Sequence, residues 1–152
     1  MKKFVPDAEL VGIDYGDGFD WSLVQPLEVN GLRALRRVYL VDFSLPPADM
    51  KRLAESCDLV WIDHHKSAIE ACYGPGADVP YILGLRHTEY AACELTWHWF
   101  SGREFCLDRS HTAEDIGAWI DKGPEFPEAV RLLGRYDVWD AENPDWPRIE
   151  AF

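Results

Sequence analysis

The sequence predicts an α/β fold in which parallel strands are joined by crossover helices. Two short apolar runs, at residues 38–41 and 59–62, are each followed directly by an aspartate, as expected for strands that are buried on both faces. Between these runs, residues 46–57 begin with two prolines and then place apolar side chains at positions i, i+3, i+4 and i+7, the spacing of one helix face. A strand, a helix and a second strand in this order are typical of a parallel sheet.

Patterns on either side of this unit predict the remaining elements. An apolar segment at residues 9–14 predicts an earlier strand, and residues 81–83 predict another strand after a Gly-Pro-Gly loop. The helical spacing of apolar side chains predicts three more helices, over residues 89–100, 112–120 and 127–134. The last of these helices is expected to bury Val130 and Leu133, and the proline-containing tail is expected to be irregular.

The composition limits the possible functions. A chain of 152 residues, of which 47% are hydrophobic, is long enough to bury one core, so we expect a single domain over residues 1–152. The formal net charge of −12 opposes the binding of long duplex nucleic acid, but it allows short oligonucleotides or small phosphate esters as ligands. No apolar run is long enough to span a membrane, and the polar start of the chain predicts a cytoplasmic protein.

The densest group of possible ligands lies at the predicted carboxyl ends of the two central strands. Asp42 follows the first strand, and Asp63, His64 and His65 follow the second. Loops converge at this edge of an open parallel sheet, which is where ligands usually bind. A lone Asp42 or Asp63 is equally compatible with a helix cap or a hydrogen-bonded turn. Two adjacent histidines beside carboxylates, however, are a donor set that suits Mn, Fe or Zn.

Longer motifs around these residues resemble a known family. The strand sequence VYLVDFS is followed by VWIDHHKSAIE, then by EYAACELTWHWF and by LLGRYDVWD. A short signature, Tyr15-Gly16-Asp17, precedes all four. In this order the motifs are similar to those of the DHH phosphoesterase superfamily, and most similar to its oligoribonuclease-like branch. The resemblance covers residues 15–140 and implies a DHH-domain fold.

The resemblance also implies a role for each candidate residue. Asp42 would bridge two metal ions, while His64 and Asp137 would be ligands of one of them. His65 would face the substrate phosphate, and Asp63 would orient its neighbours through hydrogen bonds. The implied activity is Mn-dependent or Mg-dependent hydrolysis of phosphodiesters in short oligonucleotides or nucleotides, because two adjacent cations can clamp a phosphate and activate a bridging hydroxide.

The sequence departs from the family pattern at both ends. Asp14 and Asp17 superficially match the first acidic motif of the family, but they lie too close to Asp42 to leave room for the helix and strand that separate the two motifs in relatives. We therefore expect the chain to start after that motif, to lack the central strand that carries it, and to lack the C-terminal accessory domain. An alternative function follows, namely an inactive binding module or a half-enzyme completed by a partner chain. Exposed strand edges would favour a homo-oligomer or that complementing chain.

Other residues that could bear chemistry are expected to have structural roles. His98 is expected to be a partly exposed helix residue, and no C-x-x-C pair is present, so the cysteines are expected to be free buried thiols. Trp139, close to Asp137, is the exception, since it is a candidate for stacking on a base. The four cysteines are Cys57, Cys72, Cys93 and Cys106.

Overall fold

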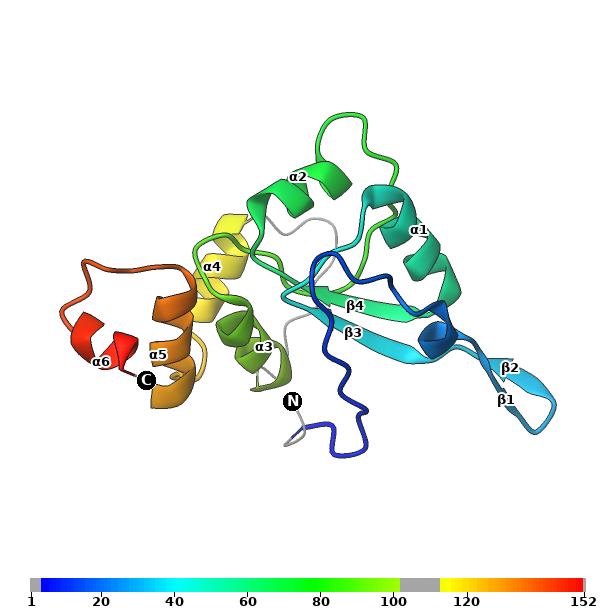
Figure 1. Cartoon of the computed structure of the whole chain (residues 1–152), viewed down its shortest axis with the longest axis horizontal. Helices are drawn as coiled ribbons and strands as arrows, with labels where there is room; N and C mark the ends of the chain where they lie inside the picture. The colour runs from blue at the N-terminus through cyan, green and yellow to red at the C-terminus, as the bar shows by residue number, and fades with distance from the viewer. Residues whose placement is uncertain (1–3, 102–112, 152) are drawn as a thin grey trace.

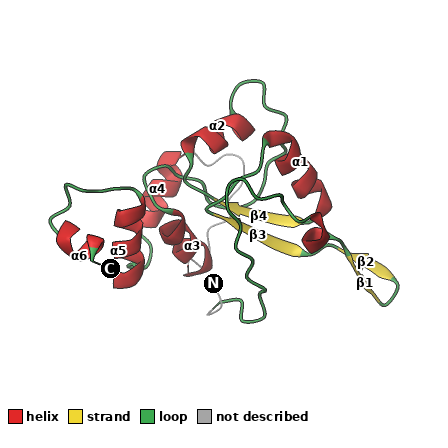
Figure 2. Ribbon diagram, viewed as in Figure 1, coloured by secondary structure: helices red, strands yellow, loops and turns green. Residues whose placement is uncertain are grey.

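The computed structural model describes residues 4–101 and 113–151 and shows a mixed α/β fold (Figures 1 and 2). Its centre is a parallel pair of strands, β3 (Arg37–Val41) and β4 (Asp58–Ile62), connected by helix α1 (Pro47–Ser56). The register runs from the pair Arg37 and Asp58 to the pair Val41 and Ile62. The predicted strand–helix–strand unit is therefore confirmed, and both strands end at the same edge.

Helices cover both faces of this strand pair. Successive strand residues alternate between the faces, so each strand contributes side chains to two cores. Leu40 and Trp61 belong to a core with residues of α1 and of α2 (Lys66–Tyr73). Val60 and Ile62 belong to a second core with residues of α3 (Ala92–Ser101) and α4 (Ala113–Asp121). Burial on both faces explains why the two strands are continuous apolar runs.

A third segment extends the sheet beyond β4. The predicted strand at residues 81–83 is not a regular strand, but isolated parallel bridges join Val60 to Leu83 and Asp63 to Arg86. Between these bridges Gly84 has a φ of +136°, and a Cβ atom built there would lie 1.9 Å from the Trp61 carbonyl oxygen. Only glycine fits at this position. The parallel pairing with β4 is interrupted at Gly84 and continues in the same direction at Arg86.

The C-terminal helices pack to one side of the sheet. Helix α5 (Glu128–Asp137) packs on α3, and α6 (Trp146–Glu150) packs on α5 (Figure 1). Helix α5 continues beyond its predicted end and buries Leu132, whereas Leu133 is exposed. The predicted inward position of Leu133 is wrong, because the close approach of α5 to α3 sets which face of the helix is inside. The tail was expected to be irregular but contains α6.

Two parts of the N-terminal region differ from the prediction. Residues 9–14 form no strand, and Leu10 and Val11 are exposed, since no described strand lies beside them to pair with. A hairpin that was not predicted joins β1 (Leu27–Val29) to β2 (Leu32–Ala34). Its turn at Asn30 and Gly31 has φ values of 54° and 75°, both positive as in a type I′ turn. A 3-10 helix, η1 (Trp21–Val24), precedes the hairpin.

Other predictions concern single residues and helix bounds. The helix predicted over residues 89–100 begins later, at Ala92, and the one predicted over 112–120 corresponds to α4. Cys57 and Cys72 are buried free thiols and Cys93 is a half-buried one, while Cys106 lies outside the described residues. None of the helices in the described ranges is long and apolar enough to cross a membrane.

Candidate metal centre

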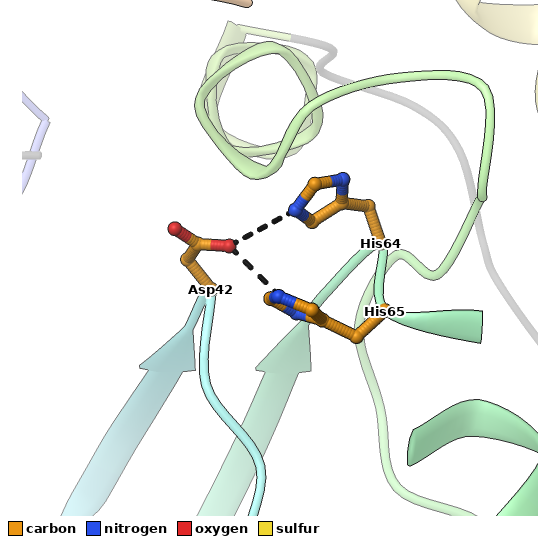
Figure 3. Close-up of side chains that lie close together, drawn as sticks. All are labelled: Asp42, His64 and His65. Atoms are coloured by element: carbon orange, nitrogen blue, oxygen red, sulfur yellow. Dashed lines mark ion pairs between the residues drawn. The ribbon is translucent and has the colours of Figure 1, made fainter. Parts of the chain in front are cut away.

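The carboxyl ends of β3 and β4 bring Asp42 beside the segment that follows β4. The Asp42 N–H donates to the Ile62 carbonyl at 3.0 Å, which extends the parallel ladder by one residue. At Asp42 the backbone then enters the left-handed region, with a φ of 57°. Figure 3 shows the Asp42 carboxylate pointing at the rings of His64 and His65. The two strand ends therefore bring these polar side chains together at one edge of the sheet.

His64 is the centre of this arrangement. Its Nε2 lies 3.2 Å from Asp42 Oδ1 and 3.4 Å from Asp137 Oδ2. Asp137 is the last residue of α5, so a helix from a distant part of the sequence supplies the second carboxylate. The imidazole nitrogen is thus flanked by two carboxylate oxygens that belong to separate elements.

Asp63 anchors the two histidines. Its carboxylate is fully buried, and Oδ1 accepts hydrogen bonds from the backbone N–H groups of His64 at 2.8 Å and His65 at 3.2 Å. The same oxygen lies 2.6 Å from His65 Nδ1, and Oδ2 accepts from Trp61 Nε1 at 3.2 Å. A proton on His65 Nδ1 satisfies this contact, which leaves Nε2 of the same ring for another ligand.

The two carboxylates around His64 oppose each other electrostatically. Burial, followed by repulsion from Asp137, raises the pKa of Asp42 above its ordinary value, and the two histidines act in the opposite direction. A bound cation would reverse this balance, because it favours the ionised form of every carboxylate near it. Without a cation, the cluster therefore places two like charges close together at a cost in free energy.

The donor set fits a divalent ion. One ligand atom from each of Asp42, His64 and His65 lies within 4.8 Å of the others, and this is the one such group of His, Cys, Asp or Glu found in the described part of the chain. Ligands on neighbouring positions of an ion, with bonds of about 2.1 Å, are roughly 3 Å apart. The separations of 3.2 Å and 3.4 Å around His64 Nε2 are close to that spacing. The group includes neither the predicted ligand Asp137 nor Asp14 and Asp17.

Sequence reasoning missed two residues that bear on the position of the cluster. The Tyr15 ring lies 4.6 Å from that of Phe43 and 6.1 Å from that of His65, centroid to centroid, so the N-terminal segment passes beside the cluster. The second is Glu94 on α3, which binds Arg135 on α5. The signal for Tyr15 was the Tyr15-Gly16-Asp17 signature, whereas no local pattern indicates the partner of Glu94.

The remaining histidines in the described ranges lie outside the cluster. His98 is only 1% exposed, so its expected partial exposure is wrong. Its ring is enclosed by Trp119 and Phe126, which pack against it edge to face. His87 is also buried, and its Nδ1 accepts a hydrogen bond from the Glu89 N–H. Neither histidine belongs to the group around Asp42.

Together, the fold and the site define an α/β protein with a candidate metal centre at the carboxyl edge of a parallel sheet. Compared with family models, curated proteins and solved structures, the chain has no match. The resemblance to DHH phosphoesterases therefore stays an expectation from the sequence motifs alone.

Proposed function

We propose that the chain carries a DHH-type metal centre that hydrolyses phosphodiesters in short oligonucleotides or nucleotides. The observation that carries the proposal is the position of His64 Nε2, 3.2 Å from Asp42 and 3.4 Å from Asp137. An imidazole nitrogen flanked by two carboxylates is a donor set of the kind that suits a divalent ion. The acidic net charge of −12 further supports a short substrate rather than a long duplex.

Each residue of the cluster has a role in this proposal. Asp42, His64 and Asp137 hold the ion, and Asp63 fixes the orientation of His65 through its hydrogen bond to Nδ1. The Nε2 atom of His65, when it also carries a proton, can donate a hydrogen bond to a phosphate oxygen of the substrate. A bound divalent ion supplies a water of lowered pKa and polarises the phosphoryl oxygen.

The ligand types favour Mn²⁺ over Mg²⁺. Mg²⁺ prefers oxygen ligands and keeps several waters, whereas Mn²⁺ also accepts imidazole nitrogen. In this proposal the ion is held by the imidazole nitrogen of His64 together with the carboxylates of Asp42 and Asp137. Mn²⁺ is therefore the metal that we propose, with Mg²⁺ as a weaker substitute.

A second candidate function is a binding module or half-enzyme. In the part of the chain that the structure describes, the compact donor group offers ligands for one ion. A two-metal clamp needs further carboxylates, because both ions must be held at about 3.5 to 4 Å from each other. In this alternative the chain binds one metal without turnover, or a partner chain supplies the missing ligands.

The sheet edge supports a partner. Within the described ranges no strand pairs with the outer side of β3, so its outward backbone N–H and C=O groups are open to another strand. We place a second copy of the chain there, and a complementing chain is the alternative occupant. Either would protect the edge from nonspecific pairing.

The test measures metal binding and hydrolysis together. The purified chain is titrated with Mn²⁺ and then incubated with a short RNA oligonucleotide, beside the variants His64→Ala, Asp137→Asn and Asp78→Asn. Asp78 is an exposed carboxylate that pairs with Lys51 away from the cluster, so Asp78→Asn is the control. We expect the first two variants to lose metal and product release, and the control to keep both.

The outcomes separate the two candidate functions. Metal binding with no hydrolysis would support the binding module or half-enzyme. Failure of the unmodified chain to bind Mn²⁺, or equal binding by His64→Ala, would overturn both.

A further inference from the structure

An aromatic cluster forms at the end of α5, where Tyr136 and Trp139 stand on either side of Asp137 in the sequence. The rings of Trp139 and Trp146 meet edge to face at 5.1 Å, and Tyr136 lies 6.0 Å from Trp139 and 6.2 Å from Trp146, measured between centroids. Trp139 is 66% exposed and Tyr136 is 46% exposed. Large aromatic side chains usually bury most of their surface. The exposed Trp139 ring, which packs against the rings of Tyr136 and Trp146, is therefore available for stacking on a ligand.

The backbone holds the Trp139 ring in a fixed place. Trp139 has a φ of 53°, in the left-handed region that bulky side chains rarely adopt. Its N–H donates to the Tyr136 carbonyl at 3.0 Å, and the Ala141 N–H donates to the Trp139 carbonyl at 2.8 Å. These two hydrogen bonds fix the backbone of the turn that follows α5 and thus the position of the Trp139 Cα atom.

A shallow hollow that is open to solvent adjoins the ring. Asp140 and Glu142 lie on its wall, and the cation of the wall, Arg135, is bound to Glu94 at 2.8 Å. The hollow thus suits an uncharged planar group and opposes a second phosphate. Its wall is formed by Arg135, Val138, Trp139, Asp140, Ala141 and Glu142.

The ring and the metal centre are joined by a short stretch of chain. Asp137, whose carboxylate lies 3.4 Å from His64 Nε2, is separated from Trp139 by Val138. Two trans peptide units span at most about 7.6 Å between Cα atoms. A phosphate at the centre and a base on the ring would therefore belong to the same nucleotide or to neighbouring ones.

We propose that Trp139 is a specificity-determining residue that stacks on the base of a nucleotide ester bound at the metal centre. The inference rests on the proposed function and narrows it: the substrate carries a nucleobase next to the scissile phosphate, and a phosphodiester without a base is a poor substrate. Stacking depends on a flat π-face, so Trp139 selects for a base without selecting which base.

The experiment compares a dinucleotide with a counterpart in which one nucleoside is abasic, each with Mn²⁺. Trp139→Ala is expected to raise KM for the dinucleotide about tenfold, the order of one lost base stack, and to change KM for the abasic ester little. Trp139→Phe keeps a ring and is expected to retain most of the preference. Leu133→Ala removes an exposed apolar side chain from α5, the helix before the turn that carries Trp139, and is the control. An equal effect of Trp139→Ala on both esters, or no effect, would overturn the proposal.

Further measurements keep this test separate from that of the metal centre. Mn²⁺ affinity is expected to be the same in Trp139→Ala and in the unmodified chain. If the unmodified chain hydrolyses neither ester, the proposed activity fails, and the stacking site is judged by quenching of tryptophan fluorescence on addition of AMP. Quenching that disappears in Trp139→Ala supports the site, and quenching that is unchanged in that variant overturns it.

Discussion

Glu94 on α3 accepts hydrogen bonds from Arg135 Nη2 on α5 at both carboxylate oxygens, at 2.9 Å and 2.8 Å. The Glu94 carboxylate is buried, and it also accepts from the Ala91 N–H at 2.9 Å. A Cβ on Gly134 would lie 2.6 Å from Glu94, so the glycine permits this close approach of the two helices. The pair fixes α5, and with it Asp137, relative to the sheet.

The first prediction concerns this pair. Arg135→Ala leaves the Glu94 carboxylate buried without its partner, so we expect a loss of about 3–5 kcal/mol in the free energy of unfolding. We also expect a Mn²⁺ affinity roughly 10- to 100-fold lower in the fraction that stays folded, because Asp137 loses its support. Arg148→Ala breaks an exposed pair with Glu128 and is the control, with little expected change. Urea unfolding measures the loss of stability, and metal titration measures the Mn²⁺ affinity. An unchanged Mn²⁺ affinity would show that the pair of Glu94 and Arg135 does not support the metal site.

The second prediction is that Asp42 lowers stability when no metal is bound. Burial and repulsion from Asp137 raise the pKa of Asp42 above its ordinary value of 3.8. Ionising this carboxylate in the folded chain therefore costs free energy, and the free energy of unfolding decreases as the pH rises above 3.8. Asp42→Asn removes this cost, and in EDTA at pH 7 we expect a gain of about 0.5 kcal/mol, small because the side chain is half exposed. Mn²⁺ should raise the Tm of the unmodified chain and leave that of Asp42→Asn unchanged. A lower Tm of Asp42→Asn in EDTA would contradict the prediction.

The third prediction is a loss of stability at acidic pH that depends on His98. Burial lowers the pKa of His98 below its ordinary value of 6.5, so the unfolded chain takes up a proton there at a higher pH than the folded chain does. The stability contributed by the neutral ring is present above pH 6.5 and is lost as the pH falls through the folded-state pKa. Between pH 7.5 and pH 5.5, His98→Phe should lose less stability in urea unfolding than the unmodified chain does. Equal losses would show that His98 does not titrate on unfolding.

The fourth prediction concerns self-association at the outer edge of β3. Light scattering at micromolar concentration should give a mass above that of one chain, falling on dilution. Alternation along the ladder turns the N–H of Arg37 outward, since the neighbouring Arg36 carbonyl accepts from the Asp58 N–H. Arg37→Pro removes this outward donor, and Arg37→Ala removes only the side chain that pairs with Asp58. If Arg37→Pro dissociates and Arg37→Ala does not, the contact between copies lies at the outer edge of β3. A stable monomer of the unmodified chain would contradict the prediction.

The sequence predicted the centre of the fold because its signals are local. Each central strand is an apolar run ended by an aspartate, and the helix between them begins with prolines, so β3, α1 and β4 could be expected in parallel order. Parallel strands end at one edge, which placed Asp42 near His64 without any knowledge of tertiary structure.

The parts that sequence reasoning missed depend on contacts between distant elements. Residues 9–14 have an apolar pattern, but a strand needs a partner, and none of the described strands lies beside them. The burial of His98 and the pairing of Glu94 with Arg135 depend on how α3 packs against the helices that follow it. The approach of Asp137 to His64 was expected from the motif order alone, and its distance came only from the packing of α5.

Gly84 shows how tolerance to mutation can mislead a search for the site. Every other amino acid would place an atom 1.9 Å from the Trp61 carbonyl oxygen, at a backbone angle that side chains rarely adopt. In a survey of all single substitutions scored by growth or abundance, position 84 would therefore be among the least tolerant of the chain, although the residue has no side chain to offer a substrate. Exposed Trp139, in contrast, would score as dispensable for abundance, and only a screen for selectivity would reveal it.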